Sequence, residues 1–203
     1  MENKQYKDNM NKTEQIIKRS VDFVIAACCL IFFSPLAIAC AIAIRLEDGL
    51  PVIYRQERIG LHGKPFFIYK FRSMKIDAEK DGPDLLEIKG DPRLTKVGRY
   101  LRMHHLDELP QLWNVFIGDM SLVGPRPEVK KYTDLYTEEQ KQVLQVRPGI
   151  TDWASIKYVD ENKILGESKD PDEAYVNLIM PNKIKLNMVY IQHQTLGEYF
   201  KII

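Results

Sequence analysis

The chain has 203 residues, 45% of them hydrophobic and 28% charged, and its formal net charge is +1. This composition is typical of a folded protein and excludes an intrinsically disordered one. A near-neutral charge is not that of a protein that coats nucleic acid, so no nucleic-acid partner is predicted. Cysteine spacing excludes a disulfide scaffold and a zinc ribbon, because Cys28, Cys29 and Cys40 form no CxxC pair.

Residues 21–44 form the most apolar stretch, and no charged residue occurs from 23 to 44. One spanning helix is an alternative, since about 20 apolar residues cross a bilayer. Ser34 and Pro35 lie near the middle, however, and proline removes a backbone donor. The two halves are then ~15–20 Å long, against a hydrocarbon core of ~30 Å. We therefore predict a re-entrant membrane helix over 18–46, preceded by a polar arm over 1–17.

Basic residues flank both ends of the apolar stretch: Lys18 and Arg19 precede it, and Arg45 follows it. Because positive charge favours the cytoplasmic side, both ends are predicted to lie there. Lys18 and Arg19 are predicted to anchor the segment at the membrane interface. Membrane lipid is therefore an expected partner.

Residues 47–203 are predicted to form one cytoplasmic domain of helix-rich α+β class, because their number suits a single domain. Aromatic and β-branched runs at 52–55 and 65–71 flank a glycine-rich turn, a pattern that favours a β-hairpin. Glycine and proline mark a loop over 81–92. Helices are expected from Leu94 onward and over 109–116, 138–146 and 171–194, the last kinked or divided at Pro181.

Basic residues recur at steps of three at the start of the first of these helices, at Arg93, Lys96, Arg99 and Arg102. Residues three apart lie on one helical face. A solvated basic face is one interpretation. Contact with anionic headgroups or with a phosphorylated substrate is the other, because a membrane segment precedes this region.

Two adjacent carboxylates, Asp107 and Glu108, follow the basic helix. Asp107 precedes Pro110 by three residues and is therefore a candidate helix N-cap. A metal site with His104 and His105 is another alternative. A third interpretation combines the carboxylates with arginines on Pro/Gly turns, such as Arg126, because a guanidinium binds phosphate oxygens at two points.

Several motifs resemble those of the bacterial sugar transferases, the monotopic phosphoglycosyl transferases that act on undecaprenyl phosphate. The run at 91–102 reads DPRLTKVGRYLR, that at 106–115 reads LDELPQLWNV, and that at 118–127 reads GDMSLVGPRP. Shorter matches are RQERIG at 55–60, KFRSM at 70–74 and RPGIT at 147–151. The resemblance extends from about residue 16 to 154 and matches the small form of the family.

The resemblance implies that a UDP-sugar gives its sugar phosphate to undecaprenyl phosphate, with release of UMP, at the cytoplasmic face of the bacterial inner membrane. It also implies a magnesium ion. Asp107 matches the family's nucleophile and is the expected magnesium ligand, and Glu108 is its catalytic partner. Substrate phosphates are expected at Arg102, Arg126 and Lys70. The resemblance leaves a homodimer open.

Residues 152–160 depart from the family pattern, because Asp152 replaces a usual glycine and Val159 a usual arginine. A membrane-anchored, catalytically weak scaffold for assembly is therefore a second interpretation. A glycosidase is disfavoured, because its two carboxylates lie on opposite sides of one bond and neighbouring residues rarely do so.

Overall fold

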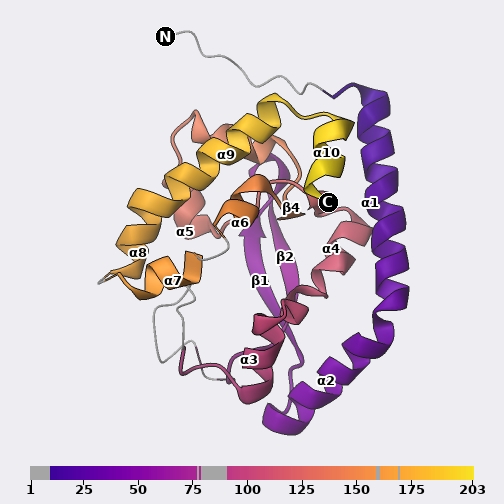
Figure 1. Cartoon of the computed structure of the whole chain (residues 1–203), viewed down its shortest axis with the longest axis vertical. Helices are drawn as coiled ribbons and strands as arrows, with labels where there is room; N and C mark the ends of the chain where they lie inside the picture. The colour runs from indigo at the N-terminus through magenta and orange to yellow at the C-terminus, as the bar shows by residue number, and fades with distance from the viewer. Residues whose placement is uncertain (1–9, 77, 79–90, 159–160, 169) are drawn as a thin grey trace.

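A computed structural model describes residues 10–76, 78, 91–158, 161–168 and 170–203 (Figure 1). This part of the chain is an α+β structure in which helices predominate, as the sequence predicted. Most of the loop predicted over 81–92 lies outside the described residues, as does Val159.

The N-terminal segment consists of two helices, α1 (Lys12–Phe32) and α2 (Ser34–Asp48), which meet at a bend of 59°. The break between them is at Phe33. Pro35 lies in the first turn of α2, where a helix does not need the missing N–H. The bent helix pair predicted from Ser34 and Pro35 is therefore present.

The first helix begins earlier than the sequence analysis placed it. Asn11 and Glu14 form a reciprocal capping box, in which each side chain accepts the backbone N–H of the other residue at 2.9 Å. This cap starts α1 at Lys12. The polar arm predicted over 1–17 is therefore helical from Lys12 onward.

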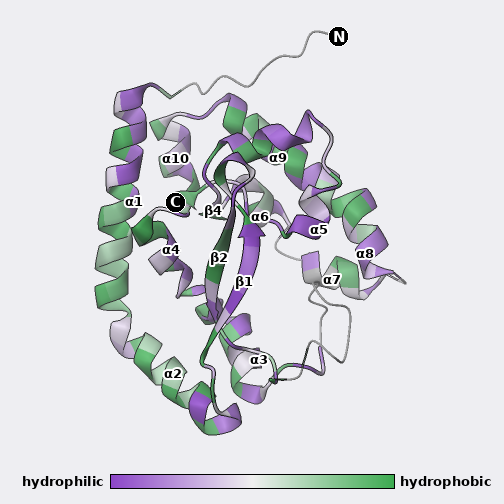
Figure 2. Ribbon diagram, turned by 180° about the vertical axis from the view of Figure 1, so that it is seen from behind, coloured by the Kyte–Doolittle hydropathy of each residue, from purple (hydrophilic) through white to green (hydrophobic). Residues whose placement is uncertain are grey.

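No single helix in the described part of the chain is both long and apolar enough to cross a bilayer, but α1 and α2 together meet that test by length and composition. Apolar residues cover much of both helices around the bend (Figure 2). Several large apolar side chains there are exposed, namely Ile31, Phe32, Ile38 and Ile42. The pair thus has the form expected of a re-entrant membrane segment.

The predicted β-hairpin is confirmed and occupies the middle of the molecule (Figure 1). Strands β1 (Ile53–Ile59) and β2 (Pro65–Phe71) pair antiparallel in unbroken register. A second sheet, which the sequence did not predict, pairs β3 (Ser121–Val123) with β4 (Gly149–Thr151) in parallel. Strands this short have no measurable alternation, so their pairing is not visible in the sequence.

Two of the predicted helices are confirmed as α3 (Lys96–Met103) and α4 (Gln111–Ile117). The helix expected over 138–146 is a 3₁₀ helix, η4 (Gln140–Gln145). The helix expected over 171–194 is divided near Pro181 into α8 (Pro171–Ala174), a π-helical turn η5 (Tyr175–Ile179) and α9 (Met180–Gln192). Proline has no N–H for the preceding turn, and a local change of helix type accommodates that loss.

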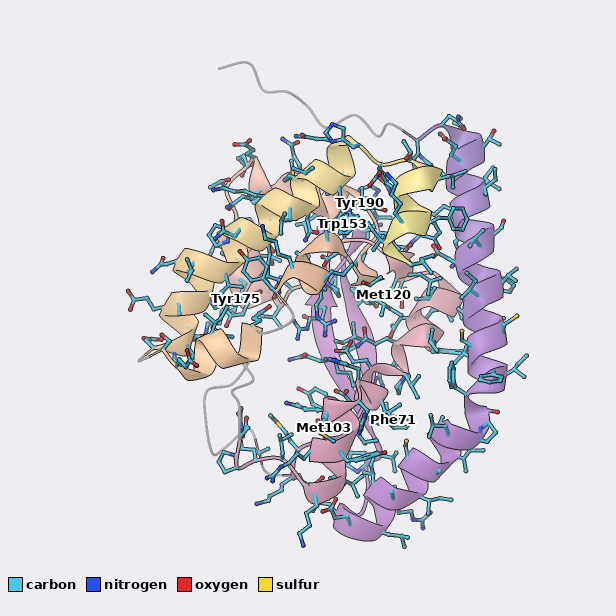
Figure 3. All side chains as sticks on the ribbon, viewed as in Figure 1. Phe71, Met103, Met120, Trp153, Tyr175 and Tyr190 are labelled. Carbon is cyan, nitrogen blue, oxygen red and sulfur yellow. The ribbon has the colours of Figure 1, made fainter. Side chains whose placement is uncertain are left out.

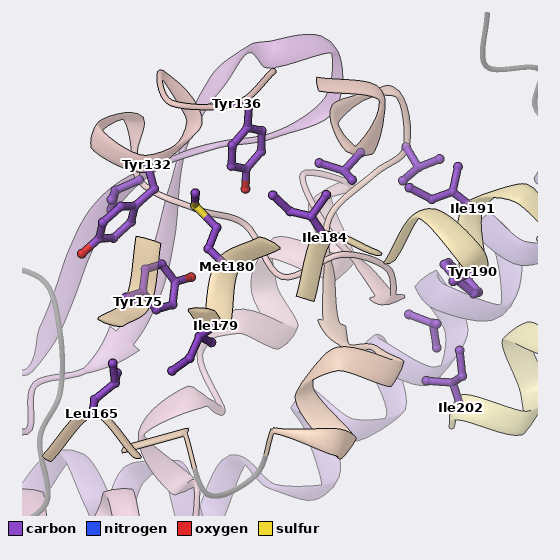
Figure 4. Packing of buried hydrophobic residues seen from close by; sticks show 14 of the residues in the cluster. Tyr132, Tyr136, Leu165, Tyr175, Ile179, Met180, Ile184, Tyr190, Ile191 and Ile202 are labelled. Atoms are coloured by element: carbon purple, nitrogen blue, oxygen red, sulfur yellow. The ribbon is translucent and has the colours of Figure 1, made fainter. Parts of the chain in front are cut away.

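The described residues also contain two short 3₁₀ helices, η1 (Leu61–Gly63) and η3 (Leu106–Glu108), and four further α-helices. These α-helices are α5 (Lys130–Thr133), α6 (Trp153–Lys157), α7 (Glu161–Gly166) and α10 (Leu196–Ile202). The largest buried cluster joins α9 and α10 to the segments around β3 and η4, and its aromatic members include Tyr136, Tyr175 and Tyr190 (Figure 4). Two smaller clusters bury Ala26 of α1 against Val115 and Ile44 of α2 against Leu101. Both N-terminal helices therefore contribute to the core.

Candidate active site

Glu108 lies between two cations that come from distant parts of the chain. Its carboxylate is 2.9 Å from the Nζ of Lys70 on β2, and it accepts two hydrogen bonds from the Arg126 guanidinium, one of them from Nη1 at 3.1 Å. The side chains of Glu108 and Lys70 are only 18% and 14% exposed. Burial alone would raise the pKa of Glu108, but Arg126 and Lys70 outweigh it and hold that pKa well below its ordinary value.

A backbone clamp fixes Lys70 in this position. Asn114 of α4 is fully buried and binds β2 on both sides of Ile68. Its Oδ1 accepts from the N–H of Tyr69 at 3.1 Å, and its Nδ2 donates to the carbonyl of Phe67 at 2.7 Å. The clamp sets the register of β2 against α4, and hence the direction in which Lys70 points. Sequence reasoning did not identify Asn114.

Arg126 lies on a turn whose backbone is packed against the turn after Pro148. A Cβ on Gly124 would lie 2.4 Å from the carbonyl oxygen of Arg147, and one on Gly149 would lie 2.1 Å from the nitrogen of Gly124. Only glycine allows this approach at either position.

Asp152 holds the same turn by a second contact. Its Oδ2 accepts the backbone N–H of Arg126 at 3.1 Å, while its Oδ1 caps α6 at the N–H of Ser155. Asp152 is fully buried. The sequence marked this residue as a departure from the family pattern, and the structure gives the departure a role in positioning Arg126.

Arg102 lies on α3, which approaches the chain at Ser73, just after the end of β2. Its Nε donates to the Ser73 hydroxyl at 2.7 Å. A Cβ on Gly98 would lie 1.9 Å from the Ser73 carbonyl oxygen, so the helix reaches this distance only with glycine there. Phe71 and Met103 mark this end of the hairpin in Figure 3.

The sequence predicted one continuous basic helical face from residue 93 to 102, and this prediction is wrong for Arg93. Thr95 caps α3 by accepting the N–H of Gly98 at 2.8 Å, so the helix begins only at Lys96. Arg93 lies before the helix, is buried and pairs with Asp91, with Nη2 and Oδ2 2.6 Å apart. Lys96 and Arg99 are exposed, and Arg102 is half-buried.

Asp107 lies directly before Glu108 in a short 3₁₀ turn, η3 (Leu106–Glu108), and is 5% exposed. The turn follows His105, whose left-handed φ of 54° reverses the chain after α3. The N-cap position of α4 belongs to Pro110. Asp107 therefore does not occupy the cap position that was the alternative interpretation of its place in the sequence.

The end of α2 is attached to the start of α3. The Glu47 carboxylate accepts the backbone N–H groups of Lys96 and Val97, each at 2.8 Å. Arg72 donates to the carbonyls of Asp48 and Gly49 at 2.9 Å and lies 3.2 Å from the Asp48 carboxylate. These contacts place the apolar segment beside the helix that contains Arg102.

Lys18 and Arg19, which the sequence predicted as anchors at the membrane interface, have partners within the protein. The Lys18 ammonium is buried and donates to the Ser121 hydroxyl and to the Val123 carbonyl. Arg19 donates to the last-turn carbonyls of α4, Val115 at 2.6 Å and Phe116 at 2.8 Å. A guanidinium in this position stabilises a helix C-terminus. Both residues therefore dock α1 onto the rest of the protein.

Asp22 completes the docking of α1. It is fully buried, and its Oδ1 accepts the N–H of Leu122 at 2.9 Å and the hydroxyl of Tyr199 at 2.8 Å. Burial, with the Asp22 carboxylate as a second cause, holds the pKa of Tyr199 well above its ordinary value, so the hydroxyl remains a donor. One acidic side chain thus joins α1 to β3 and α10.

The metal-binding capacity of the site is limited. In the described ranges, no group of three or more His, Cys, Asp or Glu side chains is arranged to hold a metal ion, which disfavours the His104–His105 alternative. Glu108 binds two cationic side chains, and Asp107 is the other carboxylate of the pair. Magnesium binds through one or two carboxylates together with substrate phosphates, and Asp107 fits that donor set.

Comparison with known proteins identifies the family. Residues 13–203 match the model of the family described as bacterial sugar transferase. The chain therefore belongs to the bacterial sugar transferases, an enzyme family whose curated members include undecaprenyl-phosphate sugar phosphotransferases. The expectation from the sequence motifs is confirmed.

Three relatives show how much of the chain is shared. It is 36% identical to UDP-glucose:undecaprenyl-phosphate glucose-1-phosphate transferase of Escherichia coli over 98% of this chain and 41% of that protein. It is 46% identical to EpsL, an uncharacterized sugar transferase of Bacillus subtilis, over 76% of this chain and 74% of that protein. It is 38% identical to UDP-N-acetylgalactosamine-undecaprenyl-phosphate N-acetylgalactosaminephosphotransferase of Aeromonas hydrophila, over 89% of this chain and 40% of that protein. The chain thus spans less than half of two of these proteins.

Proposed function

We propose that this protein transfers a sugar 1-phosphate from a UDP-sugar to undecaprenyl phosphate, releases UMP, and so begins the synthesis of a bacterial glycoconjugate such as an O-antigen, a capsule, an exopolysaccharide or a glycoprotein glycan. The supporting observation is the buried Asp107 next to Glu108, whose carboxylate is bound by Lys70 and Arg126. The names of two of the relatives above contain this donor class and this acceptor.

The proposed chemistry has two displacements at one phosphorus atom. A carboxylate oxygen of Asp107 attacks the phosphorus that bears the sugar, the bond to the UMP oxygen breaks, and UMP leaves. An oxygen of the polyprenyl phosphate then attacks the same phosphorus and frees the Asp107 carboxylate. A covalent intermediate divides one difficult transfer into two easier ones.

Positive charge is required because an anionic nucleophile approaches an anionic diphosphate. Arg126 and Arg102 present guanidinium groups suited to phosphate oxygens, and Lys70 adds a point charge. Glu108 orients Lys70 and Arg126 through the contacts described above. A magnesium ion at Asp107, when bound with the substrate, would offset further phosphate charge.

Release of UMP tests this function directly. The full chain in lipid nanodiscs, incubated with polyprenyl phosphate, magnesium and each member of a panel of UDP-sugars, is expected to release UMP with at least one of them. Product analysis should then show one sugar phosphate added to the lipid. If the folded protein releases no UMP with any donor, the scaffold interpretation replaces the enzymatic one.

We also propose that the protein lies at the cytoplasmic face of the inner membrane, with both ends of the bent pair on that side. Lys12→Cys and Ile76→Cys place thiols at exposed positions outside the apolar segment, in a chain whose native cysteines are replaced by alanine. An impermeant thiol reagent is expected to leave both sites unlabelled in intact cells and to label both in inside-out vesicles.

A straightened helix provides the control for this topology. Combined Ser34→Ala and Pro35→Leu changes remove the break, and the straight helix is expected to expose Lys12→Cys to the outside. Labelling of Lys12→Cys from outside in the chain with Ser34 and Pro35 intact would disprove the re-entrant arrangement.

A further inference from the structure

A group of charged and polar side chains that the proposed mechanism does not use lies directly after Arg126 in the chain. Its centre is the carboxylate of Glu128, which is 13% exposed and lies between β3 and α5. One carboxylate oxygen, Oε1, accepts the hydroxyl of Tyr175, and the other, Oε2, lies 3.7 Å from Nη1 of Arg58. Glu128 thus joins a residue of β1 to a residue of η5.

The backbone around Glu128 is fixed to the end of β1. The Glu128 carbonyl accepts the N–H of Ile59 at 2.8 Å, and Arg58 donates to the Pro127 carbonyl at 3.3 Å. Pro127 also restricts its own φ. Together with the contacts described above for the first half of the turn, these bonds hold the backbone on both sides of Arg126.

Arg58 places a second guanidinium near Arg126. Its side chain is 17% exposed. Burial lowers the pKa of Arg58, the Glu128 carboxylate opposes that effect, and the positive charge of Arg126 adds to it. Like charges repel more strongly where water is excluded. The two arginines are therefore each paired with a carboxylate, Arg58 with Glu128 and Arg126 with Glu108.

Tyr175 holds the Glu128 carboxylate from the side of the C-terminal helices. It is 3% exposed, and burial, with Glu128 as the next cause, holds the pKa of Tyr175 well above its ordinary value. The hydroxyl therefore remains a donor to the carboxylate. Tyr175 is the first residue of the π-helical turn η5, a type of turn that is frequent at functional sites. Its ring lies beside that of Tyr132, with the centroids 4.7 Å apart (Figure 4).

The charge of Glu128 has a direct consequence for Arg126. Without that charge, Arg58 would be a largely buried cation that has lost its carboxylate partner and repels the neighbouring guanidinium. Repulsion would weaken the two hydrogen bonds from Arg126 to Glu108. A merely structural role of Glu128 would instead lower the stability of the protein without a specific effect on Arg126.

We propose that Glu128 is a positioning residue for the transfer reaction, which neutralises Arg58 and fixes the end of the turn, and so keeps the Arg126 guanidinium at Glu108 and directed to the substrate phosphates. Tyr175 acts through Glu128 by holding its carboxylate in place. The inference rests on the proposed function and extends the set of residues that determine activity to η5. Glu128, Arg58 and Tyr175 do not act at the reacting phosphorus.

Chemical modification tests the position of Arg126 without a need for turnover. Phenylglyoxal reacts with guanidinium groups, and a guanidinium bound to a carboxylate at two points is protected. In Glu128→Gln, studied as the full chain in nanodiscs, the rate of modification of Arg126, measured by mass spectrometry of its peptide, is expected to rise about tenfold.

Two variants calibrate this measurement. Glu108→Gln weakens the contact of Arg126 directly and should also raise its modification rate. Tyr132→Phe is the matched control for loss of a bond between a tyrosine and a carboxylate, because the Tyr132 hydroxyl donates to Asp172 at 2.7 Å. The modification rate of Arg126 in Tyr132→Phe should equal that of the wild type.

A double-mutant cycle on kcat/KM tests the effect on catalysis. Glu128→Gln alone should lower the kcat/KM of the UDP-sugar about tenfold, because it weakens the placement of Arg126. In a chain that already contains Arg126→Ala, Glu128→Gln should lower kcat/KM by less than about twofold, because the side chain that it positions is absent. A merely structural loss would lower kcat/KM by the same factor in both chains.

The proposal is overturned if Glu128→Gln leaves the modification rate of Arg126 unchanged, or if the two factors in the cycle are equal. Should Glu128→Gln not fold, Tyr175→Phe decides by the same two measurements. It removes one hydrogen bond to Glu128 and keeps the ring, so smaller changes in the same directions are expected.

Failure of the inference and failure of the function remain distinct. Faster modification of Arg126 in Glu128→Gln, in a protein that releases no UMP from any UDP-sugar, contradicts the function and supports the inference. A wild type that releases UMP, together with an unchanged modification rate in Glu128→Gln, contradicts only the inference.

Discussion

Asp107→Asn is expected to fold as the wild type does and to lose transfer activity by about three orders of magnitude or more, because an amide oxygen is a poor nucleophile at phosphorus. Asparagine has nearly the same shape as aspartate, so the η3 turn should keep its structure. Initial rates of UMP release and thermal unfolding in nanodiscs measure the two effects separately.

The covalent intermediate gives an independent measurement. Wild type incubated with the correct UDP-sugar and magnesium, without lipid acceptor, is expected to gain the mass of one sugar phosphate on the peptide that contains Asp107. Asp107→Asn should gain none. A stable and active Asp107→Asn protein would overturn the two-step mechanism.

Arg126→Lys is expected to reduce kcat/KM by roughly 10- to 100-fold, because lysine keeps the charge and loses the two-point contact with Glu108 and with phosphate. Arg126→Ala should reduce it further. Lys130→Ala provides the control, since it removes an exposed positive charge on α5 and should leave kcat/KM unchanged. Wild-type kcat/KM in a folded Arg126→Ala protein would refute the assignment of Arg126.

Replacement of Arg126 is also expected to change the pH dependence of the reaction rate, because Arg126 affects the pKa of Glu108. In the wild type, Arg126 and Lys70 hold the pKa of Glu108 well below its ordinary value despite its burial, so the carboxylate stays charged throughout the working range. Its contribution to stability is present above the unfolded pKa of about 4.3 and is lost as the pH falls toward the folded value. Arg126→Ala removes one of the two cations, and burial then raises the pKa. The acidic limb of its pH–rate profile should therefore lie at higher pH than that of the wild type.

Local patterns in the sequence predicted the parts of the fold that depend on neighbouring residues. The hairpin, α3, α4 and the break at Ser34 and Pro35 all follow from alternation, helical spacing or proline chemistry within a few residues. The parallel pairing of β3 with β4 was not predictable, because it depends on a backbone approach between Gly124 and Gly149. Nothing in either short segment alone indicates the other.

In the candidate site, too, the sequence predicted some residues and missed those whose role depends on distant contacts. The sequence selected Lys70, Glu108 and Arg126 by motif, and the structure brings them into contact. It did not indicate Asn114 or the role of Asp152, because their importance lies in which backbone groups they bind across the fold. The charge pattern also did not predict the partner of Lys18. The sequence shows that this residue is basic, but it does not show that its ammonium group binds the Ser121 hydroxyl.

The buried contacts of α1 determine how the protein can be handled and altered. Lys18 and Asp22 have their partners on β3, and Asp22 also binds Tyr199 of α10 near the chain's last residue. Deleting the apolar helices to obtain a water-soluble catalytic fragment would leave Tyr199 and the Leu122 N–H without their acceptor and would uncover the apolar surface that packs on Ala26. Such a fragment is expected to aggregate rather than fold. Detergent or nanodisc samples of the full chain are thus the appropriate material, and a chimaera with a foreign membrane helix would have to reproduce residues 18, 19 and 22.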